Sequence, residues 1–333
     1  MRAAFEPIGG AVARNSVAIG IERFRESNLK WYMLGLNGFG ALAHLIGVVV
    51  TLSIGRLDIR MRTYRTNPLN IGNATHPVLS GEAVRDMPVY PTYVLVAFFA
   101  LSLAAHVFVS INIALSLVYT KEKVFRWYMD GLYRNIAIHR WIEYFFSASL
   151  MIFLMALLLG IRDMTVLILL TGLMGITIVF GWIVEVHSSD YIVDVADPKD
   201  RRKFYFGWML ERRWAEASWI SRLQFHVLGY LPYALLWTVI IERFDANMRQ
   251  LDDALPDFVN VAVIGSVVIF TGFGVVQLAL QVYSFGPSLY WLGEVMYVVM
   301  SFTAKAQLGF VVLTQALVEG GLYDTALSLT ADS

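Results

Sequence analysis

The chain has 333 residues, of which 57% are hydrophobic and only 16% are charged. Soluble domains average about 45–50% apolar and about 25% charged residues, so this composition indicates a membrane protein and excludes a disordered one. The formal net charge of +0 gives no basic field for nucleic acid. The chain has no cysteine, which excludes disulfide scaffolds, zinc–thiolate sites and cysteine nucleophiles.

Seven apolar stretches are long enough to cross a bilayer, because a hydrocarbon core of about 30 Å needs about 20 apolar residues in a helix. They are residues 32–54, 91–118, 141–161, 164–186, 223–241, 258–283 and 288–317. Gly229 and Pro232 interrupt the fifth stretch, but neighbouring helices can satisfy the carbonyl that a proline leaves free. We therefore predict an all-α membrane protein built as a bundle of seven transmembrane helices.

Basic residues determine the predicted orientation. Lysine and arginine are concentrated before the first predicted helix, between the second and third, and between the fourth and fifth. Cytoplasmic segments carry such an excess, so we predict a cytoplasmic N-terminal tail over 1–30, a helical domain over 31–317 and an extracellular tail over 318–333. Residues 1–30 carry charges throughout and lack a clean apolar run, so we expect no cleavable signal peptide there.

Two connections between the predicted helices are long. Residues 55–90 carry scattered Arg, Pro, Gly and Thr, and we expect a structured extracellular loop with short strands after the first helix. Residues 187–222 are expected to form a charged cytoplasmic loop, which is either a docking surface or a simple connector. We favour the connector.

The charge pattern singles out one lysine. Of the six lysines, five are assigned to the tail or the loops, and Lys305 lies deep in the last apolar stretch. A charged side chain at mid-membrane costs roughly 2.5–3.5 kcal/mol on insertion scales, so it needs a partner or a modification. One interpretation is a lysine that snorkels or pairs within the bundle. The other is a desolvated, nucleophilic amine that forms a Schiff base with a carbonyl ligand.

Acidic residues within the predicted helices are few: Glu143 begins the third, Glu185 ends the fourth, and Glu294 lies early in the seventh. Arg140 and Glu143 are three residues apart and can meet on one helical face, which favours a simple pair at the helix end. With Lys305 present, Glu143 is predicted to be the counterion of that lysine. An acid and a base that share a dry bundle core satisfy each other.

Polar residues surround this pair at helical spacing. Ser301 precedes Lys305 by one turn, and Ser147 follows Glu143 by one turn. On the first two predicted helices the polar residues at mid-span include His44, Ser102 and His106. An isolated buried serine or histidine is usually hydrogen-bonded in the core. Two mid-membrane histidines beside a lysine–glutamate pair favour a proton-relay role instead.

Short motifs in the predicted helices agree with one family. The third helix contains Arg140-Trp141-Ile142-Glu143-Tyr144 and Ser147-Ala148-Ser149. The seventh contains Gly293-Glu294 and Ser301 through Lys305. The first contains His44-Leu45-Ile46, and the second contains Ala105-His106. Together they resemble the signatures of the heliorhodopsins, over roughly residues 31–317. Phe270 stands where that family carries phenylalanine and ordinary microbial rhodopsins usually carry tryptophan. The predicted inside N-terminus and long first outer loop also agree with the family.

The resemblance implies a rhodopsin-like bundle with all-trans retinal bound covalently to Lys305 as a protonated Schiff base. Glu143 would be the primary counterion, and hydrogen bonds from Ser102, Ser147 and Ser301 would tune the Schiff base. Phe270 and Gln277 would line or support the retinal pocket.

The resemblance also implies a path for the released proton. His44 and His106 would belong to a water-containing cytoplasmic cavity that holds this proton transiently, with Glu294 and Arg140 in the same relay. Family members generally form homodimers, so a homodimer is expected here.

We therefore predict a light sensor with a slow photocycle that acts in the lipid bilayer through a conformational change or an unidentified cytoplasmic partner. The alternative is light-gated passive proton conductance through His44, His106, Glu143, Glu185 and Glu294. A classical pump is disfavoured, because Ser301 and Leu154 stand where such pumps usually carry carboxylates. An enzyme is the least favoured class, since the histidines show no metal-ligand spacing and no metal is expected.

Overall fold

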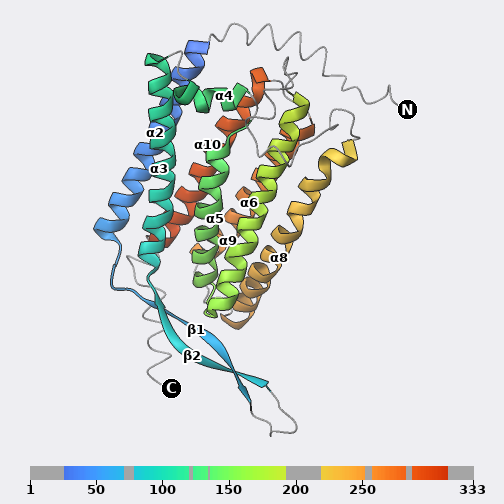
Figure 1. Cartoon of the computed structure of the whole chain (residues 1–333). Helices are drawn as coiled ribbons and strands as arrows, with labels where there is room; N and C mark the ends of the chain where they lie inside the picture. The colour runs from blue at the N-terminus through green and yellow to red at the C-terminus, as the bar shows by residue number, and fades with distance from the viewer. Residues whose placement is uncertain are drawn as a thin grey trace.

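The computed structural model describes residues 26–70, 79–119, 123–133, 136–192, 219–251, 257–282 and 287–313. Long helices make up most of this part of the chain (Figure 1). They are α2 (Glu26–Ile54), α3 (Pro91–Val118), α5 (Ile138–Leu158), α6 (Met164–Ile192), α8 (Trp219–Leu251), α9 (Asp257–Val282) and α10 (Pro287–Val311). The shorter elements are the strands β1 (Met61–Asn70) and β2 (Leu79–Val89), the 3-10 turn η1 (Lys123–Arg126) and helix α4 (Trp127–Tyr133).

Among the described residues, six helices are long and apolar enough to cross a membrane: α2, α3, α5, α6, α8 and α9. The chain is therefore an integral membrane protein with a helical bundle, as predicted. The last predicted span corresponds to α10, which runs along the bundle with the others (Figure 1). It falls outside the set of six because Glu294, Lys305 and several uncharged polar residues lower its mean hydropathy.

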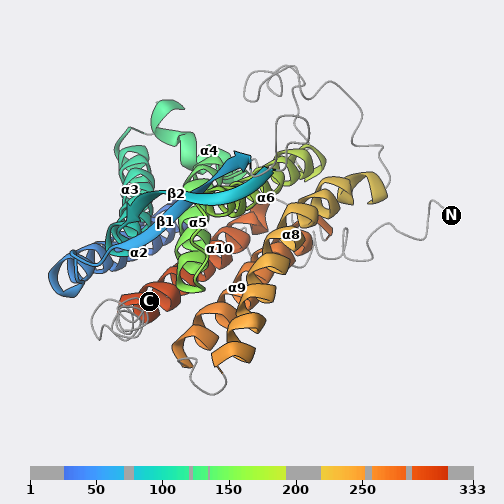
Figure 2. The same cartoon turned by 90° about the horizontal axis from the view of Figure 1, so that it is seen from below.

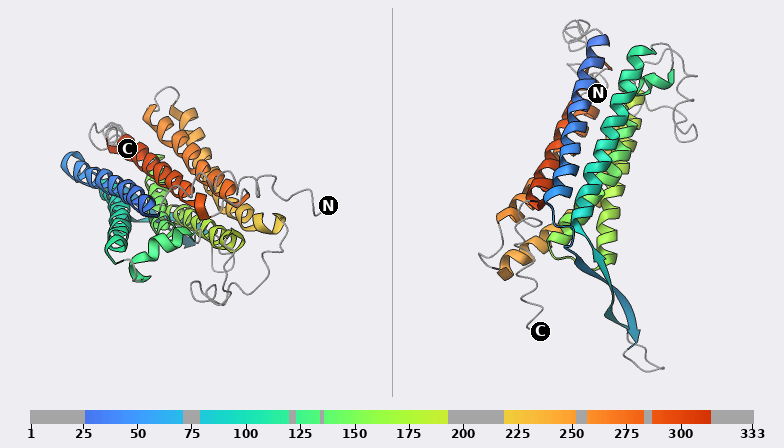
Figure 3. Two further views of the ribbon diagram at one scale, coloured as in Figure 1. Left: turned by 90° about the horizontal axis from the view of Figure 1, so that it is seen from above. Right: turned by 90° about the vertical axis from the view of Figure 1, so that its left-hand side faces the viewer.

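Helix α5 is the central helix of the bundle. Its apolar span is 72% buried, against 22–33% for the other five spans. It packs between α3 and α6, and the end-on views show it surrounded by its neighbours (Figures 2 and 3). Polar groups on α5 are consequently the ones best shielded from lipid.

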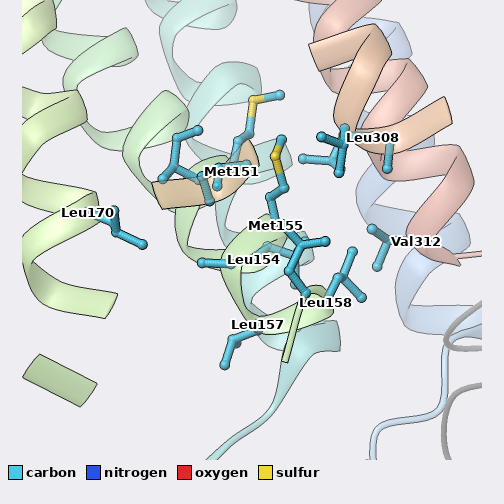
Figure 4. Close-up of a cluster of buried hydrophobic side chains, with 14 of the residues drawn as sticks. Met151, Leu154, Met155, Leu157, Leu158, Leu170, Leu308 and Val312 are labelled. Carbon is cyan, nitrogen blue, oxygen red and sulfur yellow. The ribbon is translucent and has the colours of Figure 1, made fainter. Parts of the chain in front are cut away.

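An apolar core fills the half of the bundle that contains the C-terminal turns of α5. Figure 4 shows Met151, Leu154, Met155, Leu157 and Leu158 of α5 together with Leu170, Leu308 and Val312 from α6 and the C-terminal end of α10. Leu154, Leu157 and Leu308 are fully buried. The predicted polar residues Glu143 of α5 and Lys305 of α10 precede these apolar residues in their helices.

The connection after α2 is a hairpin that projects from the bundle, so the predicted strands are present (Figure 1). β1 and β2 pair antiparallel from Met61 opposite Val89, with an irregularity between Thr63 and Arg65. The Tyr64 backbone N–H donates to the carbonyl of Arg162 at 3.0 Å, which attaches the hairpin to the turn between α5 and α6. The strands have 10 and 11 residues and are longer than expected.

Helix α5 ends earlier than the predicted residue 161. Gly160 adopts a left-handed φ of 78°, a conformation that glycine takes without steric cost. The N–H of Ile161 donates to the carbonyl of Ala156, and that of Gly160 to Leu157. This arrangement closes the helix at Leu158.

Helix α8 is longer than the predicted 223–241, and the proposed loop 187–222 is wrong at both ends. Pro232 lies inside α8, and polar residues continue the helix to Leu251, where Arg249 pairs with Asp245 at 2.7 Å one turn away. Helix α6 continues to Ile192. Arg243 and Arg249, which follow the predicted end of the fifth span, therefore lie on a helix.

Two further differences concern the first and second connections. Helix α2 begins at Glu26, so Lys30 is a buried helical residue rather than part of a tail; its neighbour Leu29 packs in a cluster with Tyr290. Helix α4, which was not predicted, places Met129 in the same cluster. Residues 1–25, 193–218 and 314–333, which include most of both predicted tails and of the loop, lie outside the described residues.

Candidate functional site

Lys305 of α10 and Glu143 of α5 form a buried ion pair. Lys305 Nζ lies 2.7 Å from Glu143 Oε1, and the two side chains are 3% and 8% exposed. The lysine also donates to Ser301 Oγ at 2.7 Å, one turn earlier on α10. Ser102 of α3 donates to the same Glu143 oxygen at 2.6 Å. Three helices thus converge on one charge pair, and the Ser301 contact is the one that helical spacing predicts.

A large cavity lies beside Lys305, between α5, α6, α8, α9 and α10. It measures about 860 Å³, including the space at its mouth, within the size range of small-molecule sites. Its walls are mainly aromatic and aliphatic, and they include Trp141, Tyr144, Met151, Phe270, Phe273 and Tyr297. Ser147, Ser301 and Lys305 line it at the ion pair, and Ser147 is fully buried.

Glycines bring the cavity walls close together at two points. A Cβ at Gly181 of α6 would lie 2.4 Å from the Trp141 ring. One at Gly274 of α9 would lie 2.6 Å from the Tyr230 hydroxyl. Any larger residue there would displace a wall ring, so the shape of the cavity depends on both glycines.

Phe270 and Gln277, the other predicted pocket residues, both line this cavity from α9. Phe270 packs with Trp237 and Phe273, with ring centroids 6.1 Å and 6.3 Å apart. The Gln277 side-chain oxygen accepts a hydrogen bond from the Tyr297 hydroxyl.

Arg140 does not pair with Glu143, so the simple pair at the helix end, which was the alternative to a Lys305 counterion, is not formed. Its guanidinium forms salt bridges with Glu185 of α6 and Glu294 of α10. It also lies over the Tyr297 ring, 3.8 Å from the centroid. Arg140 is 3% exposed, so it belongs to the core and is not one of the loop cations that set orientation.

Residues from α5 and α10 complete the Arg140 cluster. The Tyr290 hydroxyl and the Trp141 indole donate to Glu185, and His139 Nε2 lies 3.4 Å from Glu294. We did not single out Tyr290, Tyr297 or His139 from the sequence. The spacing of Glu294, Tyr297, Ser301 and Lys305 along one face of α10 was a signal that could have found Tyr297.

His44 and His106 lie together, as the family resemblance implies. Their rings are stacked with centroids 5.4 Å apart. His106 Nδ1 lies 2.9 Å from Asn37 Oδ1, and Asn37 is a further residue that we did not select from the sequence. Neither ring nitrogen of His44 has a hydrogen-bond partner within the described residues.

A smaller cavity of about 340 Å³ separates the histidines from the Arg140 cluster. Its lining includes Asn37, His106, His139, Arg140, Glu143 and Glu294. Tyr144 and Ser301 line both cavities, so the Lys305–Glu143 pair stands between them. Such a polar cavity has enough donors and acceptors to hold water.

The family model that matches the chain is that of the heliorhodopsins, over residues 33–196 and 200–317. The chain belongs to the heliorhodopsin family. None of the curated proteins compared with the chain matches it. Family membership supports a retinal-binding, light-sensing rhodopsin, and the family is generally photoreceptor-like rather than enzymatic.

The residues around Lys305 fit the retinal that the heliorhodopsin family implies. A buried amine faces a large, mainly aromatic cavity, as a linkage to an apolar aldehyde requires. Glu143 supplies the negative charge that a cationic nitrogen needs in a dry site. Gly181 and Gly274 let the Trp141 and Tyr230 rings pack against the neighbouring helices, which leaves the space beside them open for a ligand.

Proposed function

We propose that this heliorhodopsin is a light sensor in which Lys305 carries all-trans retinal as a protonated Schiff base, with Glu143 as the counterion. The observation that carries this proposal is the 2.7 Å contact between Lys305 Nζ and Glu143 Oε1 at the wall of the aromatic cavity. An unmodified ion pair would satisfy the same charges, but it would leave the cavity beside it without a role.

Retinal supplies visible-light absorption and an isomerising double bond when it is bound. Glu143 holds a negative charge against the Lys305 nitrogen, and it orients that N–H. Ser102 donates to the carboxylate, and Ser301 accepts from the lysine nitrogen. Ser147, one turn from Glu143, is the third serine that we propose to tune this nitrogen. With retinal attached, the nitrogen would keep a single N–H, which Glu143 or Ser301 would accept, and the loss of that contact would bias the helices toward a second arrangement.

The small cavity supports a transient proton store. Glu143 and His106 both line it, so a proton released beside Glu143 has a polar route toward the histidines. His44, stacked on His106, extends that route into the α2–α3 contact. Arg140 and Glu294 also line this cavity, and their salt bridge pairs the two charges there. We propose that this wall faces the cytoplasm, with α10 as the seventh span.

The polarity of the bundle supports sensing over pumping. Among the described residues, the core beyond Lys305 toward the hairpin is apolar, with Leu154, Leu157 and Leu308 fully buried. Ser301 and Leu154 also stand where pumps usually carry carboxylates. We propose that the output is a slow conformational change passed to a homodimer partner or to an unidentified cytoplasmic partner.

Light-gated passive proton conductance is the second candidate function. The chain of polar residues from His44 to Glu294 around the small cavity favours it, because such a chain could relay protons if the apolar core opened.

Illumination of voltage-clamped cells that express the protein tests sensing against conductance. For a sensor, we expect no photocurrent above that of cells that express Lys305→Ala. A visible absorption band in the wild-type membranes shows that the pigment is present in the same cells. A current that reverses with voltage would establish the conductance, and a steady current at zero driving force would establish a pump.

A further inference from the structure

The large cavity has a polar region that is separate from Lys305. His226, Tyr230 and Gln277 line it there, the first two from α8 and the third from α9. These two helices run antiparallel (Figure 1). Tyr233 Oη lies 2.8 Å from Thr271 Oγ1, and Tyr230 lies against Gly274. His226 lies one turn before Tyr230 on α8, and Gln277 lies about one turn after Gly274 on α9. Because the helices are antiparallel, His226 and Gln277 are at the same level.

This polar region lies well away from the lysine. Gln277 accepts a hydrogen bond from Tyr297, which stands eight residues before Lys305 on α10. At 1.5 Å per residue this places Tyr297 about 12 Å from Lys305 along the helix axis. Both residues line the cavity. A chain attached to Lys305 would therefore bring its far end, the retinal ring, toward His226 and Gln277.

One ring nitrogen of His226, Nε2, is buried there without a hydrogen-bond partner among the described residues. The residue as a whole is 9% exposed. Its ring packs edge-on against Tyr230, with centroids 5.1 Å apart. A buried polar atom that has no hydrogen bond costs about 1–3 kcal/mol. Because this one borders a ligand cavity, a polar group on the ligand is its natural partner.

We propose that the cavity selects a retinal whose ring carries an oxygen, as a hydroxyl or a keto group, and that His226 Nε2 forms a hydrogen bond with that oxygen. A neutral imidazole nitrogen accepts from a hydroxyl or donates to a keto group, according to its tautomer. Gln277 adds two amide N–H donors at the same level. This inference rests on the proposed function, because it requires the aldehyde end to be held at Lys305.

Competitive reconstitution of the full-length apoprotein tests the selection. An equimolar mixture of all-trans retinal and all-trans 3-hydroxyretinal is offered in limiting amount, and the bound chromophores are extracted and quantified; 4-oxoretinal replaces the hydroxy compound in a second arm. We expect about tenfold enrichment of at least one ring-oxygenated retinal, the ratio that one hydrogen bond of about 1.4 kcal/mol gives.

Variants assign the selection to His226. We expect His226→Leu to bind both chromophores equally and His226→Gln, which keeps a hydrogen-bonding group, to retain part of the enrichment. Tyr233→Phe is the matched control, since it lines the same cavity but its hydroxyl already has Thr271 as a partner, and it should keep the full ratio.

The outcomes separate this inference from the proposed function. Equal binding of plain and oxygenated retinals by the wild-type protein would overturn the selection and leave the Lys305 linkage standing, with water as the partner of His226. Enrichment that survives in His226→Leu would overturn the role of this histidine. A failure of every retinal to form pigment would overturn the proposed function itself. If His226→Leu does not fold, the wild-type ratio and His226→Gln still decide the matter.

Discussion

Arg140 lies buried between carboxylates from two other helices, Glu185 of α6 and Glu294 of α10. If this arginine is removed, both carboxylates stay in the core without their cation. We expect Arg140→Leu to lower the free energy of unfolding by about 3–5 kcal/mol, measured by denaturation in mild detergent micelles.

Arg249→Ala is the matched control for this loss. Arg249 also pairs with a carboxylate, Asp245, but the two side chains are 78% and 55% exposed. Exposed pairs contribute about 1 kcal/mol or less, so this variant should stay close to the wild type. Equal losses in the two variants would mean that burial of the Arg140 cluster does not determine its contribution.

At the residue scale, the sequence was sufficient for the Lys305–Glu143 contact but not for the partners of Arg140. Few charges occur in the apolar spans, so a lone lysine and a carboxylate early in a span are readily matched. For Arg140, the predicted helices contain three candidate carboxylate partners: Glu143, Glu185 and Glu294. Spacing along one helix shows only the nearby Glu143, whereas the partners that it contacts depend on how separate helices pack.

At the scale of elements, Phe99 of α3 is held between glycines of two neighbouring helices. A Cβ at Gly47 of α2 would lie 2.9 Å from its ring, and one at Gly309 of α10 would lie 2.4 Å away. We expect Gly309→Ala to destabilise the protein by about 1–3 kcal/mol, because a packed core accommodates an added methyl group only by shifting.

Gly172→Ala is the comparison in the middle of α6, where a Cβ would have nothing within 4 Å. Alanine is the better helix former by about 0.8–1.0 kcal/mol, so this variant should be as stable as the wild type or more stable. The pair is compared by thermal unfolding of the same detergent preparations. Equal stability of the two variants would contradict close packing of α3 against α10.

Hydropathy located the long helices well because burial in lipid requires a long apolar run. It located their ends poorly. The end of α5 depends on the left-handed Gly160, and the polar turns that extend α8 to Leu251 carry no apolar signal. Helix α4 has only seven residues, and its place depends on contacts with α3 and α10, which no local pattern shows.

At the scale of the whole molecule, the number of membrane spans determines on which sides the two termini lie. Six of the described helices are apolar enough to span the membrane on composition, and α10 would be the seventh. An odd number puts the two termini on opposite sides. The excess of basic residues in alternate connections predicts that the N-terminus is inside.

Epitope tags at the two ends test this topology. We expect a C-terminal tag to bind antibody on intact cells, and an N-terminal tag to bind only after permeabilisation. Tags on the same side would show that α10 does not cross the membrane. This orientation is predicted from charge and from the family resemblance, because a bundle of helices does not itself record which side faces the cytoplasm.

The central claim is that Lys305 holds the chromophore beside Glu143, and a visible absorption spectrum tests it most directly. The protein is expressed with all-trans retinal and purified beside Lys305→Ala, Lys30→Ala and Glu143→Gln. Lys30 is the matched control, since it is a second buried lysine, 7% exposed, on another helix.

We expect a visible band in the wild type and in Lys30→Ala, and no such band in Lys305→Ala. In Glu143→Gln the band should move to longer wavelength, because the carboxylate no longer stabilises positive charge at the nitrogen in the ground state. A wild-type protein without a visible band, or a band that persists in Lys305→Ala, would contradict the account and leave Lys305 and Glu143 as a structural ion pair.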